Sequence, residues 1–170
     1  MPRIHVCSLA ALPAAVAETG AQSIVTLLRE GVDIDRPAHI PAERHLHLGL
    51  SDIIEAEDGF ALPQAAHVEA LIAFARAWDR QAPLLIHCYA GVSRSTAAAF
   101  IATCALKPEV SEIDIARLIR ERSPTATPNA LLVQLGDASL AREGRMVEAV
   151  RTIGRGRDCF EGVPFHIDIR

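Results

Sequence analysis

The sequence predicts an α/β fold in which a mainly parallel central sheet, of about four or five strands, lies between layers of helices. Three observations predict this class. Apolar clusters rich in β-branched residues alternate with segments of helical periodicity in the first half of the chain. The chain beyond residue 95 is essentially helical, and an apolar fraction of 50% suffices to bury both faces of a sheet. Strands that alternate with helices pair in parallel, so we expect a three-layer domain.

Four apolar, β-branched clusters are the predicted strands. They cover residues 3–8, 22–28, 44–50 and 83–87. The last of these is almost entirely apolar, which is typical of a strand buried on both faces. A fifth candidate lies close to the C-terminus, where residues 163–169 form either a late edge strand or a loosely held extension.

Two segments carry clear helix signals. Between Gln64 and Arg80, apolar residues recur at the i, i+3, i+4 and i+7 spacing of an amphipathic helix, and Pro63 marks its start. Ser111 is a predicted N-cap, with Asp114 three residues later and an apolar inner face after it. Three stretches rich in turn-forming residues are the predicted loops. They are residues 31–41, 51–63 and 123–128.

Length, charge and cysteine content narrow the class of protein. A chain of 170 residues is the size of one globular domain, here residues 1–170 with 154–170 as a C-terminal extension. The net charge of −4 offers no broad basic surface, so we expect neither nucleic acid nor a membrane as partner. The four cysteines are too scattered for a disulfide framework and lack C-x-x-C spacing. Such cysteines suit a reducing compartment, so we expect a cytoplasmic protein. We also expect a monomer that holds no metal.

The segment from Pro83 to Phe100 carries the most informative pattern, a buried strand followed by a short loop and a helix. Such a loop gathers unpaired backbone N–H groups at the positive end of a helix dipole, which together form an anion site. Five residues separate Cys88 from Arg94, enough to surround one phosphate-sized dianion. The predicted phosphate-binding residues are Tyr89, Ala90, Gly91, Val92, Ser93 and Arg94. Gly91 permits a backbone conformation that a side chain would hinder.

Three side chains around this loop have the properties of a nucleophilic site. Cys88 would lie among oriented amides at a helix N-terminus, where a thiolate is stabilised and acts as a nucleophile. Arg94 can hold two oxygens of a phosphoryl group through its planar fork. Ser95 can donate a hydrogen bond to the sulfur, both when it attacks and when it leaves. A cysteine that only packs in the core would not explain why strand, glycine, serine and helix occur together.

The motif HCYAGVSRS at residues 87–95 resembles the signature loop of the cysteine-dependent protein tyrosine phosphatases, and its AG and SRS elements resemble the dual-specificity branch most. The resemblance spans roughly residues 22–140. It includes a strand that ends at residues 47–52 and a helix that opens at residues 128–132. It implies a phosphatase-type three-layer fold and two-step hydrolysis of a phosphomonoester through a phosphocysteine, with no metal or other cofactor.

The first chemical step needs a proton donor for the leaving oxygen. By similarity to the family, this acid lies on a loop after a strand, thirty-odd residues before the cysteine. Asp52 and Asp58 both satisfy that spacing, and Asp52 is preferred because the residues leading into it match the family better. Asp52 would then serve as general base for water in the second step. His87 is expected to form hydrogen bonds around the loop and tune Cys88 rather than to titrate in the reaction.

Other histidines and cysteines have structural explanations that compete with functional ones. His45 and His47 lie two apart on a predicted strand, hence on one face, but they lack a third metal ligand in register. A structural role is therefore favoured for both. Cys7 and Cys104 are interpreted as core residues, although either could form a protective disulfide with Cys88 if the fold brought the two together.

The substrate class follows from the variable positions of the loop. No residue between 89 and 93 is basic, whereas the family members that favour phosphoinositides resemble one another in carrying lysines there. We therefore expect a phosphorylated protein or an aryl phosphate as substrate, with phosphotyrosine favoured and dual specificity left open. The five arginines between residues 142 and 157 are interspersed with acidic residues, which predicts a solvated surface rather than a docking patch for phosphopeptides.

Two rival functions stay open. The same cradle could bind a phosphorylated partner without turnover, but such proteins have usually lost the cysteine, the arginine or the acid, and all three are present here. Sulfur transfer and arsenate reduction use a similar cysteine loop. Neither chemistry needs an acid such as Asp52, and the reductase would need a resolving thiol.

Overall fold

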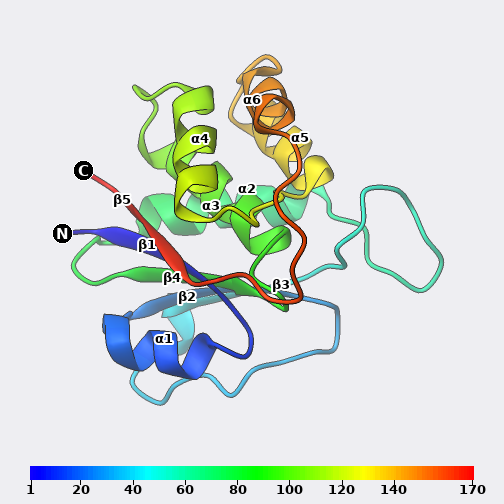
Figure 1. Cartoon of the computed structure of the whole chain (residues 1–170). Coiled ribbons are helices and arrows are strands. Elements are labelled where there is room, and N and C mark those ends of the chain that lie inside the picture. The colour runs from blue at the N-terminus through cyan, green and yellow to red at the C-terminus, as the bar shows by residue number, and fades with distance from the viewer.

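The computed structural model describes all 170 residues and contains one five-stranded sheet of order β3-β2-β4-β1-β5 (Figure 1). The strands are β1 (Arg3–Ser8), β2 (Ser23–Leu28), β3 (His45–Gly49), β4 (Leu84–Cys88) and β5 (Phe165–Asp168). The first four pair in parallel, and β5 runs antiparallel to β1. The α/β class with a mainly parallel sheet is thus confirmed, and the C-terminal segment is an edge strand.

Helices cover the two faces of the sheet unequally (Figure 1). The helices are α1 (Leu12–Thr19), α2 (Ala65–Ala77), α3 (Arg94–Leu106), α4 (Glu112–Arg122), α5 (Ala130–Ser139) and α6 (Arg145–Ile153). Of these six α-helices, α1 lies on one face and α2 to α6 lie on the other. The buried apolar residues divide in the same way, into a cluster of 32 residues on the five-helix face and a cluster of 8 beneath α1. None of the helices is long and apolar enough to cross a membrane.

Helix α3 is the central helix of the five-helix layer. Every residue from Arg94 to Cys104 is buried, so the helix is enclosed on all sides rather than amphipathic. Three consecutive alanines, residues 97–99, are fully buried and let neighbouring elements approach its backbone closely. This packing fixes the N-terminus of α3 at the carboxyl end of β4, where the predicted anion site lies.

Two predicted helices begin where the sequence indicates, and the first of them ends earlier than predicted. The Oγ of Ser111 accepts a hydrogen bond from the backbone N–H of Asp114 at 3.3 Å, so the predicted N-cap is confirmed. Helix α2 ends at Ala77, three residues before the predicted end at Arg80. It ends there because Trp78 adopts an extended backbone and donates its indole N–H to the carbonyl of Ala82 at 2.9 Å.

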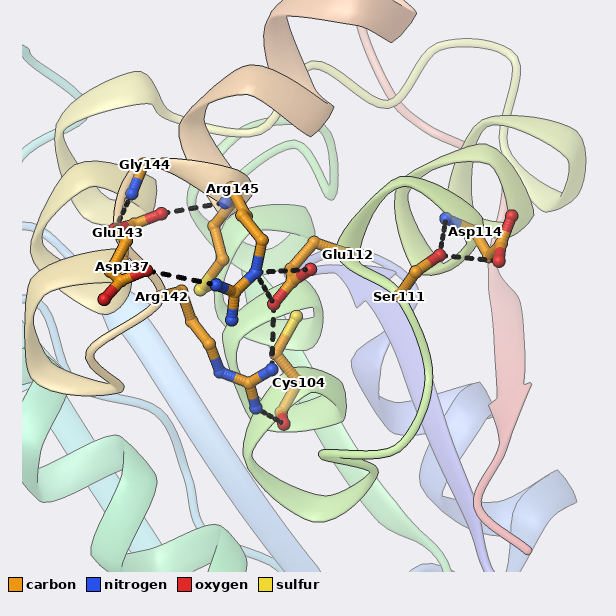
Figure 2. A network of polar contacts seen from close by, with 10 residues as sticks. Cys104, Ser111, Glu112, Asp114, Asp137, Arg142, Glu143, Gly144 and Arg145 are labelled. Carbon is orange, nitrogen blue, oxygen red and sulfur yellow. Dashed lines mark hydrogen bonds and ion pairs between the residues drawn. The ribbon is translucent and has the colours of Figure 1, made fainter.

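A polar network ties α3, α4 and α6 together (Figure 2). The carboxylate of Glu112 accepts from Arg142 at 2.8 Å and from Arg145 at 3.3 Å, and Arg142 also donates to the carbonyl of Cys104 at 2.8 Å. The side chains of Glu112 and Arg142 are only 8% and 11% exposed. The prediction of a solvated surface is therefore wrong for Arg142, which lies between helices because a buried carboxylate faces it.

Replacing Glu112 with alanine is expected to lower the free energy of unfolding by about 3 kcal/mol, because it leaves the Arg142 guanidinium buried without its counter-charge. Urea unfolding at neutral pH measures the loss. The matched control is Glu148→Ala, which removes an exposed carboxylate paired with Arg151 at 3.5 Å and should cost less than about 0.5 kcal/mol. Equal losses in the two variants would contradict the importance assigned to the buried network.

Candidate active site

Cys88 is the last residue of β4 and lies at the bottom of the loop that leads into α3. Its thiol is 2% exposed, and its Sγ lies 3.1 Å from the Oγ of Ser95 and 3.3 Å from the backbone N–H of Gly91, which donates to it. The thiol donates to the Ser95 hydroxyl in this structure, and once the thiol is deprotonated that hydroxyl and the Gly91 N–H can both donate to the sulfur and stabilise its negative charge. The structure thus brings the predicted nucleophile and its predicted serine partner into contact.

Gly91 allows the loop to press against the end of β1. Its φ is +72°, and a Cβ at this position would lie 2.8 Å from the backbone nitrogen of Ser8 and 2.9 Å from the carbonyl carbon of Cys7. A second contact, from the N–H of Leu9 to the carbonyl of Tyr89 at 3.1 Å, holds the same two segments together. Only glycine combines this left-handed backbone with so close an approach.

Arg94 begins α3 and is 9% exposed. Its Nη1 donates to the backbone carbonyl of Leu50 at 2.9 Å, which fixes the guanidinium against the loop that follows β3. The Nε of the same group is buried and has no hydrogen-bond partner. A buried cationic N–H without an acceptor is costly, and an anionic oxygen beside it would supply the missing partner.

The structure brings Asp52, and not Asp58, to the signature loop. The Oδ1 of Asp52 accepts from the Oγ of Ser93 at 2.7 Å and from the Nδ2 of Asn129 at 2.9 Å. Asp58 lies exposed farther along the loop of residues 51–63, which swings away from the sheet in Figure 1. Asn129 lies in the site but is not among the residues predicted from the sequence. It is the N-cap of α5, the helix that the family resemblance includes. Its Oδ1 also caps α5 by accepting from the N–H of Leu132 at 3.0 Å.

No protein-family model matches the chain, and no curated protein matches it. Solved structures do. DUSP15 superposes with a TM-score of 0.66 at 16% identity, over 88% of this chain and 89% of that one. The PTP-2 phosphatase of Cydia pomonella gives 0.63 at 22% identity, over 79% and 84%. A human tyrosine phosphatase-like serine/threonine/tyrosine-interacting protein gives 0.60 at 18%, over 81% and 87%.

The chain has the dual-specificity phosphatase fold. The resemblance inferred from the HCYAGVSRS motif is therefore confirmed at the level of the fold. In this dual-specificity phosphatase fold, the side chains of Cys88, Arg94, Ser95 and Asp52 gather at the carboxyl end of β4. The carboxyl ends of parallel strands are where such α/β folds bind their ligands.

His87 lies on the sheet face opposite to Cys88 and takes part in a chain of hydrogen bonds. Its Nε2 is 2.8 Å from the Oγ1 of Thr26, and the same hydroxyl is 2.8 Å from the Nε2 of His45. The side-chain hydrogen bond of His87 thus runs to β2 and not around the loop as predicted, and the tuning of Cys88 by His87 stays a prediction. His47 pairs instead with Asp33, at 3.2 Å. Burial lowers the pKa of His87 from 6.5 to about 4.

The lowered pKa of His87 predicts a loss of stability in mild acid. An unfolded histidine takes up its proton near pH 6.5, whereas buried His87 resists protonation down to about pH 4, so the unfolded state binds more protons in between. The contribution of neutral His87 is complete above about pH 6.5 and is lost as the pH falls towards 4. From pH 7 to pH 5 we expect it to cost about 2 kcal/mol, measured by urea unfolding.

The matched variant is His87→Gln, because glutamine places a hydrogen-bonding group near the position of Nε2 and does not titrate. The unfolding free energy of the native chain minus that of the variant should decrease by about 2 kcal/mol as the pH falls from 7 to 5. If the unfolding free energies of both proteins fall by the same amount, a group other than His87 causes the loss of stability in acid.

Neither Cys7 nor Cys104 is placed to form a disulfide with Cys88. Cys7 packs beneath α1, on the sheet face opposite to Cys88, because Ser8 and not Cys7 is the register partner of Cys88. Cys104 lies ten residues after Arg94 in α3, about 15 Å along the helix. Burial raises the pKa of both thiols to about 12, so both are inert core residues.

Proposed function

We propose that this protein hydrolyses phosphomonoesters on phosphorylated proteins through a phosphocysteine intermediate. The observation that carries the proposal is the buried guanidinium of Arg94, whose Nε lacks a hydrogen-bond acceptor. Arg94 is the first residue of α3, directly after the loop around Cys88. A phosphoryl group seated in that loop would satisfy this N–H and the free backbone N–H groups together. Such a group would then lie against the thiol.

In the first step, the Cys88 thiolate attacks phosphorus while the bond from phosphorus to the ester oxygen breaks. Asp52 gives its proton to the departing oxygen, and the loop amides and Arg94 hold the three remaining phosphoryl oxygens. Asp52 is suited to this task because Ser93 and Asn129 fix its carboxyl group at the rim of the loop. The products of this step are a free alcohol or phenol and phosphocysteine.

In the second step, water attacks phosphorus and gives a proton to Asp52, and the bond from phosphorus to sulfur breaks. Ser95 assists because its hydroxyl, 3.1 Å from Sγ, can donate to the sulfur as negative charge returns to it. Inorganic phosphate leaves, and the thiolate is restored. No metal is needed in either step, because protein donors hold the phosphoryl charge.

We propose phosphotyrosine as the main substrate residue, with phosphoserine and phosphothreonine as further substrates of a dual-specificity enzyme. The loop positions between Cys88 and Arg94 carry no basic side chain that would recognise additional phosphates of an inositol headgroup. Arg94 is therefore the only cationic side chain of the loop itself, which suits a single phosphoryl group.

The test is phosphate release from an aryl phosphate by the purified, reduced protein. We expect turnover that resists excess chelator and stops with vanadate, and a phosphoryl adduct on the peptide containing Cys88 after rapid quenching, detected by mass spectrometry. A folded protein that releases no phosphate would refute the enzyme. If vanadate or phosphate then raised the melting temperature, the cradle would be a binding module for phosphorylated partners instead.

A further inference from the structure

The C-terminal chain forms a strap, residues 155–162, that runs from α6 to β5 past the carboxyl end of β4 (Figure 1). Both ends of the strap are pinned. The N–H of Arg157 donates to the carbonyl of Pro124 at 2.9 Å, and the N–H of Gly162 donates to the carbonyl of Ala90 at 2.8 Å. Gly162 lies so close to the signature loop that a Cβ there would be 2.7 Å from the oxygen of Gly91. The strap is thus a fixed wall of the candidate site.

Two aromatic side chains are exposed where the strap meets the loop. Phe160 of the strap is fully exposed, at 103%, and Tyr89, the chain's only tyrosine, is 69% exposed directly after Cys88. Both line a hollow of about 350 Å³ whose other lining residues are Leu9, Ala10, Ala90 and Glu161. Five of these six residues are hydrophobic. Exposed aromatic residues in an apolar hollow mark a place where a partner buries apolar surface.

A second hollow beside the cradle is polar. It has a volume of about 300 Å³ and is lined by Asp52 and Ser93 together with strap residues of both charges, Arg155, Arg157 and Asp158. An apolar side chain of a bound ligand would therefore gain by burial mainly in the hollow of Phe160 and Tyr89. The two hollows differ in polarity, so they would distinguish the residues that flank a seated phosphoryl group.

We propose that Phe160 and Tyr89 form a specificity site for an apolar side chain of the phosphorylated polypeptide, a few residues from its phosphorylated residue. This inference rests on the proposed function. A polypeptide with its phosphoryl group in the loop lies beside this hollow, because Tyr89 and Ala90 of the loop line it. A lipid occupant is disfavoured because the net charge of −4 opposes approach to an anionic membrane.

The test compares two phosphotyrosine peptides that differ only in having leucine or asparagine at the positions within a few residues of the phosphotyrosine. The native chain should have a kcat/KM about tenfold higher for the leucine peptide, with the difference mainly in KM. Phe160→Ser should remove this preference, and Phe160→Leu should keep most of it. The matched control is Val163→Ala, which truncates a 75% exposed apolar side chain just beyond the strap, outside the hollow, and should leave the preference unchanged.

A small aryl phosphate tests the hydrolytic reaction separately from the proposed specificity site. If all variants hydrolyse it equally and only the peptide preference changes, the specificity site is supported. Equal kcat/KM for both peptides in the native chain, or a loss in Phe160→Ser that is the same for every substrate, would overturn it. Binding to phospholipid vesicles that depends on Phe160 would also overturn it, in favour of a lipid occupant.

If the native chain hydrolyses nothing, the proposed enzyme fails and the specificity site is tested by binding. Titration of both fluorescent peptides onto the native chain and onto Phe160→Ser gives two ratios of Kd. A preference for leucine that is lost in the variant supports the site, and the absence of any preference refutes it.

Discussion

Replacing Cys88 with serine should lower phosphate release from an aryl phosphate by about 10⁴-fold or more. The hydroxyl of a serine stays protonated at neutral pH, and no base lies beside Cys88 to activate it, since His87 points to the opposite face of the sheet. The oxygen is also smaller and less nucleophilic than the thiolate. Because the thiol is 2% exposed and nearly isosteric with the hydroxyl, the fold and the anion cradle should persist.

Steady-state phosphate release and thermal unfolding together check this expectation. Inorganic phosphate should still raise the melting temperature of Cys88→Ser, because the loop amides and Arg94 are unchanged. The matched control is Cys159→Ser, which replaces an exposed cysteine and should keep full activity. A Cys88→Ser protein that keeps more than about a tenth of the activity would rule out the sulfur as nucleophile.

The four parallel strands were predictable because their sequences are strong local signals. All four lie within one residue of the predicted ranges, since short apolar runs bounded by turn-forming residues indicate strands. Helix α1 was not predicted. It has eight residues with Pro13 in its first turn, and it buries only Leu12, Ala15 and Val16, so its periodicity is too short to recognise.

The signature loop was predictable because its parts are close in the sequence, whereas its surroundings depend on distant residues. Asn129 lies 77 residues from Asp52, and Thr26 lies 61 residues from His87. No local pattern pairs them. The same holds for the strap, whose Gly162 meets Ala90 only because β5 returns beside β1. The pattern of residues 163–169 fits an edge strand and a loose tail equally well, since four paired residues give a weak periodic signal.

Replacing Asp52 with asparagine should lower kcat/KM by about 10²- to 10³-fold for phosphotyrosine, and by much less for an aryl phosphate with a strongly acidic leaving phenol. A tyrosine phenolate is a poor leaving group and needs the proton of Asp52, whereas an acidic phenol departs as an anion without help. Asparagine keeps the shape of the side chain and an acceptor for Ser93 and Asn129. The comparison therefore isolates the proton from the structural contacts.

Asp58→Asn is the matched control, because Asp58 belongs to the same loop as Asp52 and has no hydrogen bond to the signature loop. It should leave kcat/KM unchanged for both substrates. An equal loss of kcat/KM for both substrates would instead indicate that Asp52 acts by holding Ser93 in place. A leaving-group-dependent loss in Asp58→Asn would move the acid to the rival aspartate, because only the group that delivers the proton can make the rate depend on the leaving group.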